Sequence, residues 1–285
     1  MAIIADILTQ VDSAATAVGA TAFDAVAAEI VPVFRIGSVL VVALVGVNLM
    51  AQAVPMTLQN GLGLMVRIAV ASAFLSSWTN FNAVYGVLTN APSEIGAVVM
   101  NAFGGGSGNL YDGLDSLYLQ ALDVGQAISQ NGSYITGALA GLLMFLVAAL
   151  MATVSIIVIS AAKIMIGVLV IFAPIAIACT LFKITAALFD RWVNLALGFA
   201  FYPMLTSGMA AFTIAIARDL TPASLTNVET IGDVLSFVVV MMLGTGLMAM
   251  VPTIAQSLAQ TATGLGGVVS STFRTGTPPA LRVAH

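Results

Sequence analysis

Long apolar runs separated by short polar stretches fill most of this chain. A membrane-spanning helix needs about 20 mainly apolar residues, because the hydrocarbon core is roughly 30 Å thick and a helix rises about 1.5 Å per residue. Helices are favoured over isolated strands, since each span must bond its own backbone groups. The pattern therefore predicts an all-α, polytopic helical membrane protein. Six segments qualify or nearly so: Val31–Val54, Leu62–Trp78, Tyr134–Ser160, Ile164–Phe182, Trp192–Ala217 and Ile231–Ser257.

The N-terminal 30 residues have a different pattern, that of an amphipathic helix. Their charged side chains are all acidic, whereas a helix lying on anionic lipid would favour Lys and Arg. A protein partner is therefore the preferred cover for the apolar face. The apolar residues of this face recur at three- and four-residue spacing: Ile4, Ile7, Leu8, Val11, Ala15, Val18, Ala22 and Val26.

A second amphipathic helix is predicted within residues 81–133, the longest non-spanning stretch. Gly104–Gly108 is expected to be a flexible break, Asn109 can cap the helix, and Asn131-Gly132 ends it. The apolar stripe packs either on the protein's own spans or on a partner subunit. Its members are Leu110, Leu114, Leu117, Tyr118, Ala121, Val124 and Ile128, of which Leu114, Leu117 and Tyr118 are candidate contact residues.

These segments predict five regions along the chain. They are the acidic helix (1–30), the first two spans (31–80), the central loop (81–133), the apolar segment with the C-terminal spans (134–257), and a tail (258–285).

Composition supports the membrane class and removes several others. Charged residues make up 7% of the chain and hydrophobic residues 60%, with a mean hydropathy of +1.09. A soluble domain carries roughly 25% charged residues, and a disordered chain needs low hydrophobicity. One cysteine, Cys179, and one histidine, His285, exclude disulfide scaffolds and zinc modules.

The distribution of Lys and Arg predicts the orientation, because these residues favour the cytoplasmic side. None occurs between Ile68 and Ala162, so the central loop is expected to be periplasmic. The C-terminal tail carries Arg274 and Arg282 and is expected to be cytoplasmic.

These two placements require an odd number of crossings after the central loop, although four apolar segments are available there. Tyr134–Ser160 is the segment expected not to cross, which leaves five spanning helices and a periplasmic N-terminus. Five of the eight Lys and Arg residues then lie on the cytoplasmic side of the membrane. A six-span model with both termini inside gives the same split, so charge leaves both models open.

The chain lacks the side chains of familiar active sites, and no enzyme, cofactor or metal is predicted. His285 ends a polar tail, which disfavours a buried nucleophile–base pair. Lys163 and Arg35 lie within about a turn of a predicted span end, where the side chain can reach water. Arg67 lies deeper in its segment; an anchoring role is favoured, although charges inside a bilayer are functional candidates.

Gly137 and Gly141 form a Gly-x-x-x-Gly pair among small residues. This spacing permits close contact between helices and favours assembly.

The stretch from Pro174 to Leu205 resembles the TrbL-like inner-membrane subunit of bacterial type IV secretion systems. In that family a span bearing Pro leads into a short Phe-x-x-Thr-x-x-x-Phe-x-x-Trp link and a further span. The link residues also fit one face of an interfacial helix. Here they are Phe182, Thr185, Phe189 and Trp192.

The resemblance implies a non-catalytic platform or channel subunit that forms a homo-oligomeric ring, for which a pentamer is one candidate size. Its implied partners are a pilin-like stalk subunit, secretion ATPases, other inner-membrane subunits, the bilayer and, transiently, the exported DNA or protein. The acidic chain predicts little DNA affinity in isolation. A small-solute transporter or channel is the alternative, and a membrane scaffold without a conduit is a third class.

Overall fold

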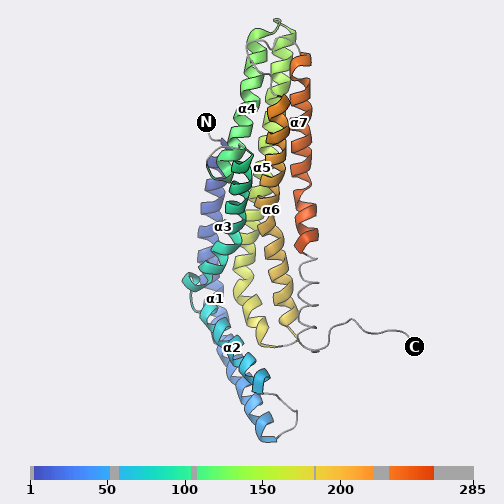
Figure 1. The fold of residues 1–285 in the computed structure, drawn as a ribbon. Helices are drawn as coiled ribbons and strands as arrows, with labels where there is room; N and C mark the ends of the chain where they lie inside the picture. The colour runs from blue at the N-terminus through green and yellow to red at the C-terminus, as the bar shows by residue number, and fades with distance from the viewer. Residues whose placement is uncertain (1–2, 52–57, 104–107, 183, 221–230, 260–285) are drawn as a thin grey trace, which may run out of the picture.

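The structure is a computed structural model that describes residues 3–51, 58–103, 108–182, 184–220 and 231–259. Every element in this part of the chain is helical, which confirms the predicted all-α class. The helices run along one long axis as an elongated bundle (Figure 1). They are α1 (Ile3–Ala51), α2 (Leu58–Leu75), α3 (Trp78–Ala102), α4 (Leu110–Asn131), α5 (Thr136–Ala178), the 3-10 helix η1 (Cys179–Leu181), α6 (Ala186–Leu220) and α7 (Ile231–Ala249).

The central element is α5, which packs against α1, α4, α6 and α7. It has 43 residues, so its length is about 65 Å at 1.5 Å per residue. This is roughly twice the thickness of a hydrocarbon core. One end of α5 lies beside α4 and the other leads through η1 towards α6 (Figure 1).

Two predicted segments, Tyr134–Ser160 and Ile164–Phe182, are joined in α5, so the prediction of separate helices is wrong. The residues between them are Ala161, Ala162 and Lys163, which favour a helix and include no Gly or Pro. The lysine side chain is covered by another helix and does not end the span. The first segment is therefore one half of a helix that is longer than the bilayer is thick.

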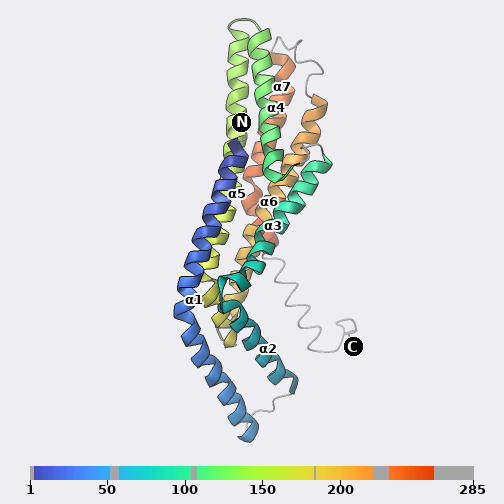
Figure 2. The same cartoon turned by 90° about the vertical axis from the view of Figure 1, so that its left-hand side faces the viewer.

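The acidic N-terminal segment and the first predicted span are likewise one helix, α1, which continues through Pro32. Its N-terminal half lies along α5. Its C-terminal half runs with α2 beyond the ends of α5 and α6, as two perpendicular views show (Figures 1 and 2).

The predicted central loop contains two helices that pack on the bundle. The amphipathic α4 begins and ends as predicted: Asn109 accepts a hydrogen bond from the Asp112 backbone in a capping box, and Gly132 is the C-cap. The pattern did not predict α3, which packs on α6. Gly61–Leu75 and Trp78–Ala102 meet at a bend of 94°.

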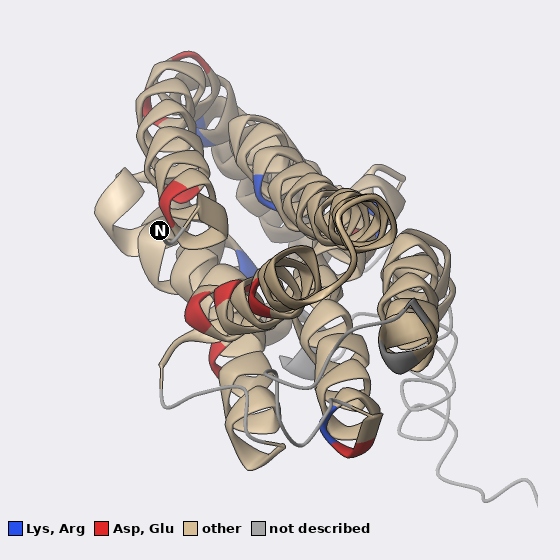
Figure 3. Cartoon of the chain, turned by 90° about the horizontal axis from the view of Figure 1, so that it is seen from above, with Lys and Arg blue, Asp and Glu red and all other residues tan. Residues whose placement is uncertain are grey.

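Four described helices are long and apolar enough to cross a membrane, or five if the bent pair counts as one span. Seen from above, the helices of the bundle carry few Lys, Arg, Asp or Glu residues (Figure 3). The multi-pass helical architecture is thus confirmed. Residues 104–107 of the predicted break Gly104–Gly108, and the tail from residue 260 onward, lie outside the described residues.

Candidate functional site

In the link between α5 and α6, the described residues Ile184 and Thr185 form a turn. It follows η1 and precedes α6, so the interpretation of residues 182–192 as one continuous helix is wrong in its first part. The Thr185 hydroxyl donates to the Cys179 carbonyl at 2.7 Å. Thr and Ser hydroxyls often bond nearby carbonyls in this way and so compete with helix formation. Phe182 is 43% exposed at this turn.

Trp192 fastens the first turns of α6 to the body of α5. Its indole Nε1–H donates to the Leu169 carbonyl at 2.8 Å. Its ring stacks on Phe189, with 5.9 Å between centroids. Phe189 and Trp192 thus lie together as predicted for one helical face, while Phe182 and Thr185 belong to the preceding turn.

Aromatic rings from three helices lie close to Trp192. Phe23 of α1 stacks on Phe81 of α3 at 4.8 Å, and Phe81 lies 6.4 Å from Trp192 of α6. Trp78, the other tryptophan of the chain, packs edge-on against Phe23 at 5.6 Å. The link residues therefore belong to a larger aromatic cluster that joins α1, α3 and α6.

The Gly-x-x-x-Gly pair of α5 is used within the chain, against α4. A Cβ at Gly137 would lie 2.8 Å from the Ile128 carbonyl oxygen, and one at Gly141 would lie 2.9 Å from the Gly125 carbonyl oxygen. Only glycine permits these helices to approach so closely. The predicted close helix contact is present, and its partner is the predicted amphipathic helix.

The apolar stripe of α4 faces the same contact. Leu114 and Leu117 are 0% and 1% exposed, against the helices of their own chain. This agrees with the first of the two interpretations, packing on the protein's own spans. Tyr118 is half-buried and offers the larger remaining area for a partner subunit.

A buried polar cluster between α1, α4 and α5 was missed by the sequence reasoning. The Lys163 ammonium lies 2.9 Å from the Asp12 carboxylate, and Lys163 is 4% exposed. The prediction that Lys163 reaches water at a span end is therefore wrong, because α5 continues past it. The Tyr111 hydroxyl also donates to Asp12. Burial and the Asp12 carboxylate raise the pKa of Tyr111, which keeps this donor protonated.

Two further carboxylates bind helix N-termini. Asp115 of α4 is buried and accepts hydrogen bonds from the backbone N–H groups of Ile4 (3.0 Å) and Ala5 (2.8 Å). Asp24 of α1 accepts one from the Trp78 N–H at 3.0 Å, at the start of α3. Unpaired N–H groups and the helix dipole make such ends favourable for carboxylates. No short-range pattern could have indicated these pairs, since each joins distant segments.

This arrangement ties helices together. Among the described residues, no group of three or more His, Cys, Asp or Glu side chains could hold a metal ion. The carboxylates of Asp12, Asp24 and Asp115 instead join α1 to α5, α3 and α4.

Comparison with known proteins identifies the family. Residues 38–251 match the model of the TrbL/VirB6 plasmid conjugal transfer proteins. The match begins inside α1, so Asp12 and Asp24 lie outside it, while the glycine pair and the α5–α6 link lie within it. None of the curated proteins matches the chain. Because the family model covers most of the 285 residues, the chain belongs to the TrbL/VirB6 family of plasmid conjugal transfer proteins, as the link residues predicted.

Proposed function

We propose that this chain is a non-catalytic platform or channel subunit in the inner membrane of a bacterial type IV secretion system. In this role it forms a homo-oligomeric ring, supports a pilin-like stalk and helps DNA or protein pass through the envelope. The family match over residues 38–251 carries the proposal. That match also favours secretion over the small-solute transporter.

The extent of exposed apolar surface supports assembly with other subunits. Exposed apolar side chains occur near both ends of α5, including Leu139 (61%), Leu146 (55%) and Phe172 (53%). A helix of about 65 Å cannot lie within a hydrocarbon core of roughly 30 Å unless it is strongly tilted. Contiguous apolar surface outside the bilayer needs protein to cover it, and neighbouring copies in a ring would do so.

The orientation belongs to the same proposal. The N-terminus and the α3–α4 region are placed in the periplasm, where α4 can face the stalk. The C-terminus is placed in the cytoplasm, where the tail can meet the secretion ATPases and other inner-membrane subunits.

Two exposed positions at opposite ends of α5 test this orientation. Tyr134 is 95% exposed and Ile184 is 92% exposed. In a Cys179→Ser background, a membrane-impermeant thiol reagent should label Tyr134→Cys in spheroplasts and label Ile184→Cys only after permeabilisation. The reverse pattern would contradict the proposed orientation.

Trp192→Ala tests the functional role. The change removes the bond to Leu169 and the stacking on Phe189, so plasmid transfer from a complemented deletion strain should fall at least tenfold. Tyr134→Ala is the matched control, because it removes an aromatic ring that is exposed. Native mass spectrometry of the wild type should show a ring. A monomer or dimer together with unchanged transfer by Trp192→Ala would contradict the proposal.

A further inference from the structure

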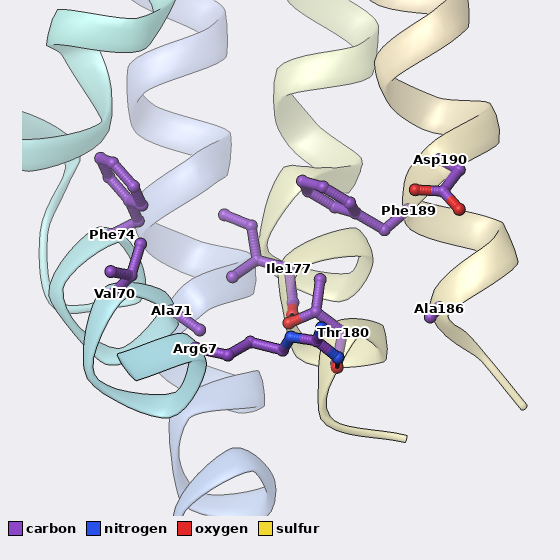
Figure 4. Close-up of a pocket in the computed structure, with 9 residues that line it drawn as sticks. All are labelled: Arg67, Val70, Ala71, Phe74, Ile177, Thr180, Ala186, Phe189 and Asp190. Atoms are coloured by element: carbon purple, nitrogen blue, oxygen red, sulfur yellow. Dashed lines mark hydrogen bonds between the residues drawn. The ribbon is translucent and has the colours of Figure 1, made fainter. Parts of the chain in front are cut away.

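A cavity of about 430 Å³ opens where α2, the end of α5 and the start of α6 meet (Figure 4). Its size lies within the usual range of small-molecule sites, about 300 to 1,000 Å³. Its walls are mainly apolar, with one basic and one acidic side chain. The lining residues are Arg67, Val70, Ala71, Phe74, Ile177, Thr180, Ala186, Phe189 and Asp190.

Arg67 provides the cation of this cavity. Its side chain extends from α2 towards Thr180 (Figure 4), where Nη1–H donates to the carbonyl oxygen at 3.5 Å. That distance is beyond the normal range of N–H···O bonds, and the guanidinium has five N–H donors. In the part of the chain that the structure describes, no ion pair engages Arg67. A planar guanidinium with free donors is well suited to bind a phosphate through two hydrogen bonds.

Asp190 provides the anion, from α6 on the other side of the cavity (Figure 4). Phe189 and Ile177 lie on the side of the cavity between the two charges, and Phe74 lines it from the α2 side (Figure 4). A ligand that satisfies all three features carries a phosphate, an amine and a hydrocarbon chain. In a multi-pass membrane protein, such an amphiphile can enter from the surrounding bilayer.

We propose that this cavity is a specific site for a glycerophospholipid with an amine-bearing headgroup, of the phosphatidylethanolamine class. The phosphate binds Arg67, the ammonium faces Asp190, and one acyl chain lies along Phe74, Ile177 and Phe189. Basic pockets between transmembrane helices bind lipid headgroups in this way. The occupant would connect α2 to the α5–α6 junction, where the protein's own contacts leave a gap. The proposal does not depend on the secretion role.

Native mass spectrometry of the delipidated full-length protein tests the site. Detergent-solubilised protein is titrated with phosphatidylethanolamine or with phosphatidylglycerol, which has the phosphate but no amine. The variants are Arg67→Gln, Asp190→Asn and Ala186→Phe, the last of which fills part of the cavity. Arg35→Gln and Asp123→Asn are matched controls, since both residues are exposed and lie outside the cavity lining. Melting temperatures in detergent establish that each variant is folded.

The expected results separate the three features of the ligand. Arg67→Gln and Ala186→Phe should weaken the binding of both lipids at least tenfold. Asp190→Asn should remove the preference for phosphatidylethanolamine and leave phosphatidylglycerol binding unchanged. The controls should bind both lipids as the wild type does.

The proposal is overturned if folded Arg67→Gln retains wild-type lipid occupancy, or if Arg35→Gln loses as much binding as Arg67→Gln. Equal binding of the two lipids by the wild type would also overturn it, because Asp190 would then recognise no amine. Plasmid transfer is measured separately. Loss of lipid binding with normal transfer would support the site and show that it is independent of the proposed function.

Discussion

The two halves of α1 belong to one continuous helix, yet they have opposite surroundings. The N-terminal half carries the acidic residues and buries Ile4, Leu8 and Phe23 at 1% exposure or less. The C-terminal half is almost purely apolar. There Ile36, Val39 and Met50 are 72%, 70% and 89% exposed. The N-terminal half therefore has one apolar face covered by protein, whereas most of the apolar C-terminal half is uncovered.

This contrast is the reverse of what a water-soluble protein shows, and it follows from the solvent. Lipid can cover apolar side chains without any protein contact, whereas an acidic residue in an apolar setting needs a donor or a cation. Asp12 has Lys163 and Asp24 has the Trp78 N–H. Asp12 and Asp24 thus join α1 to α5 and α3, and along the exposed apolar half lipid or a neighbouring subunit can provide the cover.

The largest expected effect comes from shortening a buried side chain in the N-terminal half. Phe23→Ala removes the ring that packs on Trp78 and Phe81, and it should lower the free energy of unfolding by about 3 to 5 kcal/mol. Val39→Ala in the exposed half should change it by less than about 0.5 kcal/mol. Denaturant unfolding in detergent micelles measures both. Equal losses for the two variants would remove the distinction between the halves.

Breaking the ion pair should have the next largest effect. Lys163→Met leaves the Asp12 carboxylate without its cation in a largely buried setting, which should destabilise the fold by about 3 kcal/mol. The double variant Asp12→Leu/Lys163→Met removes both charges and should recover most of the loss. If the double variant were as unstable as the single one, packing of the lysine stem rather than charge pairing would be the main contribution.

The same Gly→Leu substitution at Gly19 and at Gly46 compares the stability of the two halves of α1. Gly19 faces α5, where an added Cβ would lie 3.5 Å from Val170, so Gly19→Leu should overpack the contact and cost about 2 kcal/mol. Gly46 has no atom within 4 Å of an added Cβ. Gly46→Leu should therefore be neutral or raise stability by up to about 1 kcal/mol, since leucine favours helix more than glycine does. Melting temperatures of the pair measure the difference.

The smallest expected effect is the loss of the α1 cap. Asp115→Ala removes the acceptor of the Ile4 and Ala5 N–H groups, which should lower stability by about 1 kcal/mol. Hydrogen exchange should accelerate in the first turn of α1 and stay unchanged in its C-terminal half. Asp123→Ala, an exposed carboxylate on the same helix, should alter neither. Faster exchange in both halves would show that the cap stabilises α1 as a whole.

Elements that depend on local signals were predicted well. The limits of α4 follow from Asn109 and Gly132, and its apolar stripe follows from helical spacing. The Gly137 and Gly141 spacing indicated a close helix contact, which is present, although with the chain's own α4. The residue types identified the link to α6, but its spacing indicated a helix where the structure has a turn. The turn involves a hydrogen bond from the Thr185 hydroxyl to the Cys179 carbonyl, six residues away, which helical spacing does not predict.

By itself, the sequence determined that this protein is helical, crosses a membrane and belongs to the TrbL/VirB6 family, because hydropathy and motif spacing act over a few residues at a time. The tertiary structure decided which charges are buried, which face of α4 is covered, and that predicted segments join into the long helices α1 and α5. Asp115 and Ile4 are 111 positions apart, and Asp12 and Lys163 lie even further apart along the chain. Such pairs form only when packing brings remote segments together, because the energy of burying a charge depends on its neighbours in space.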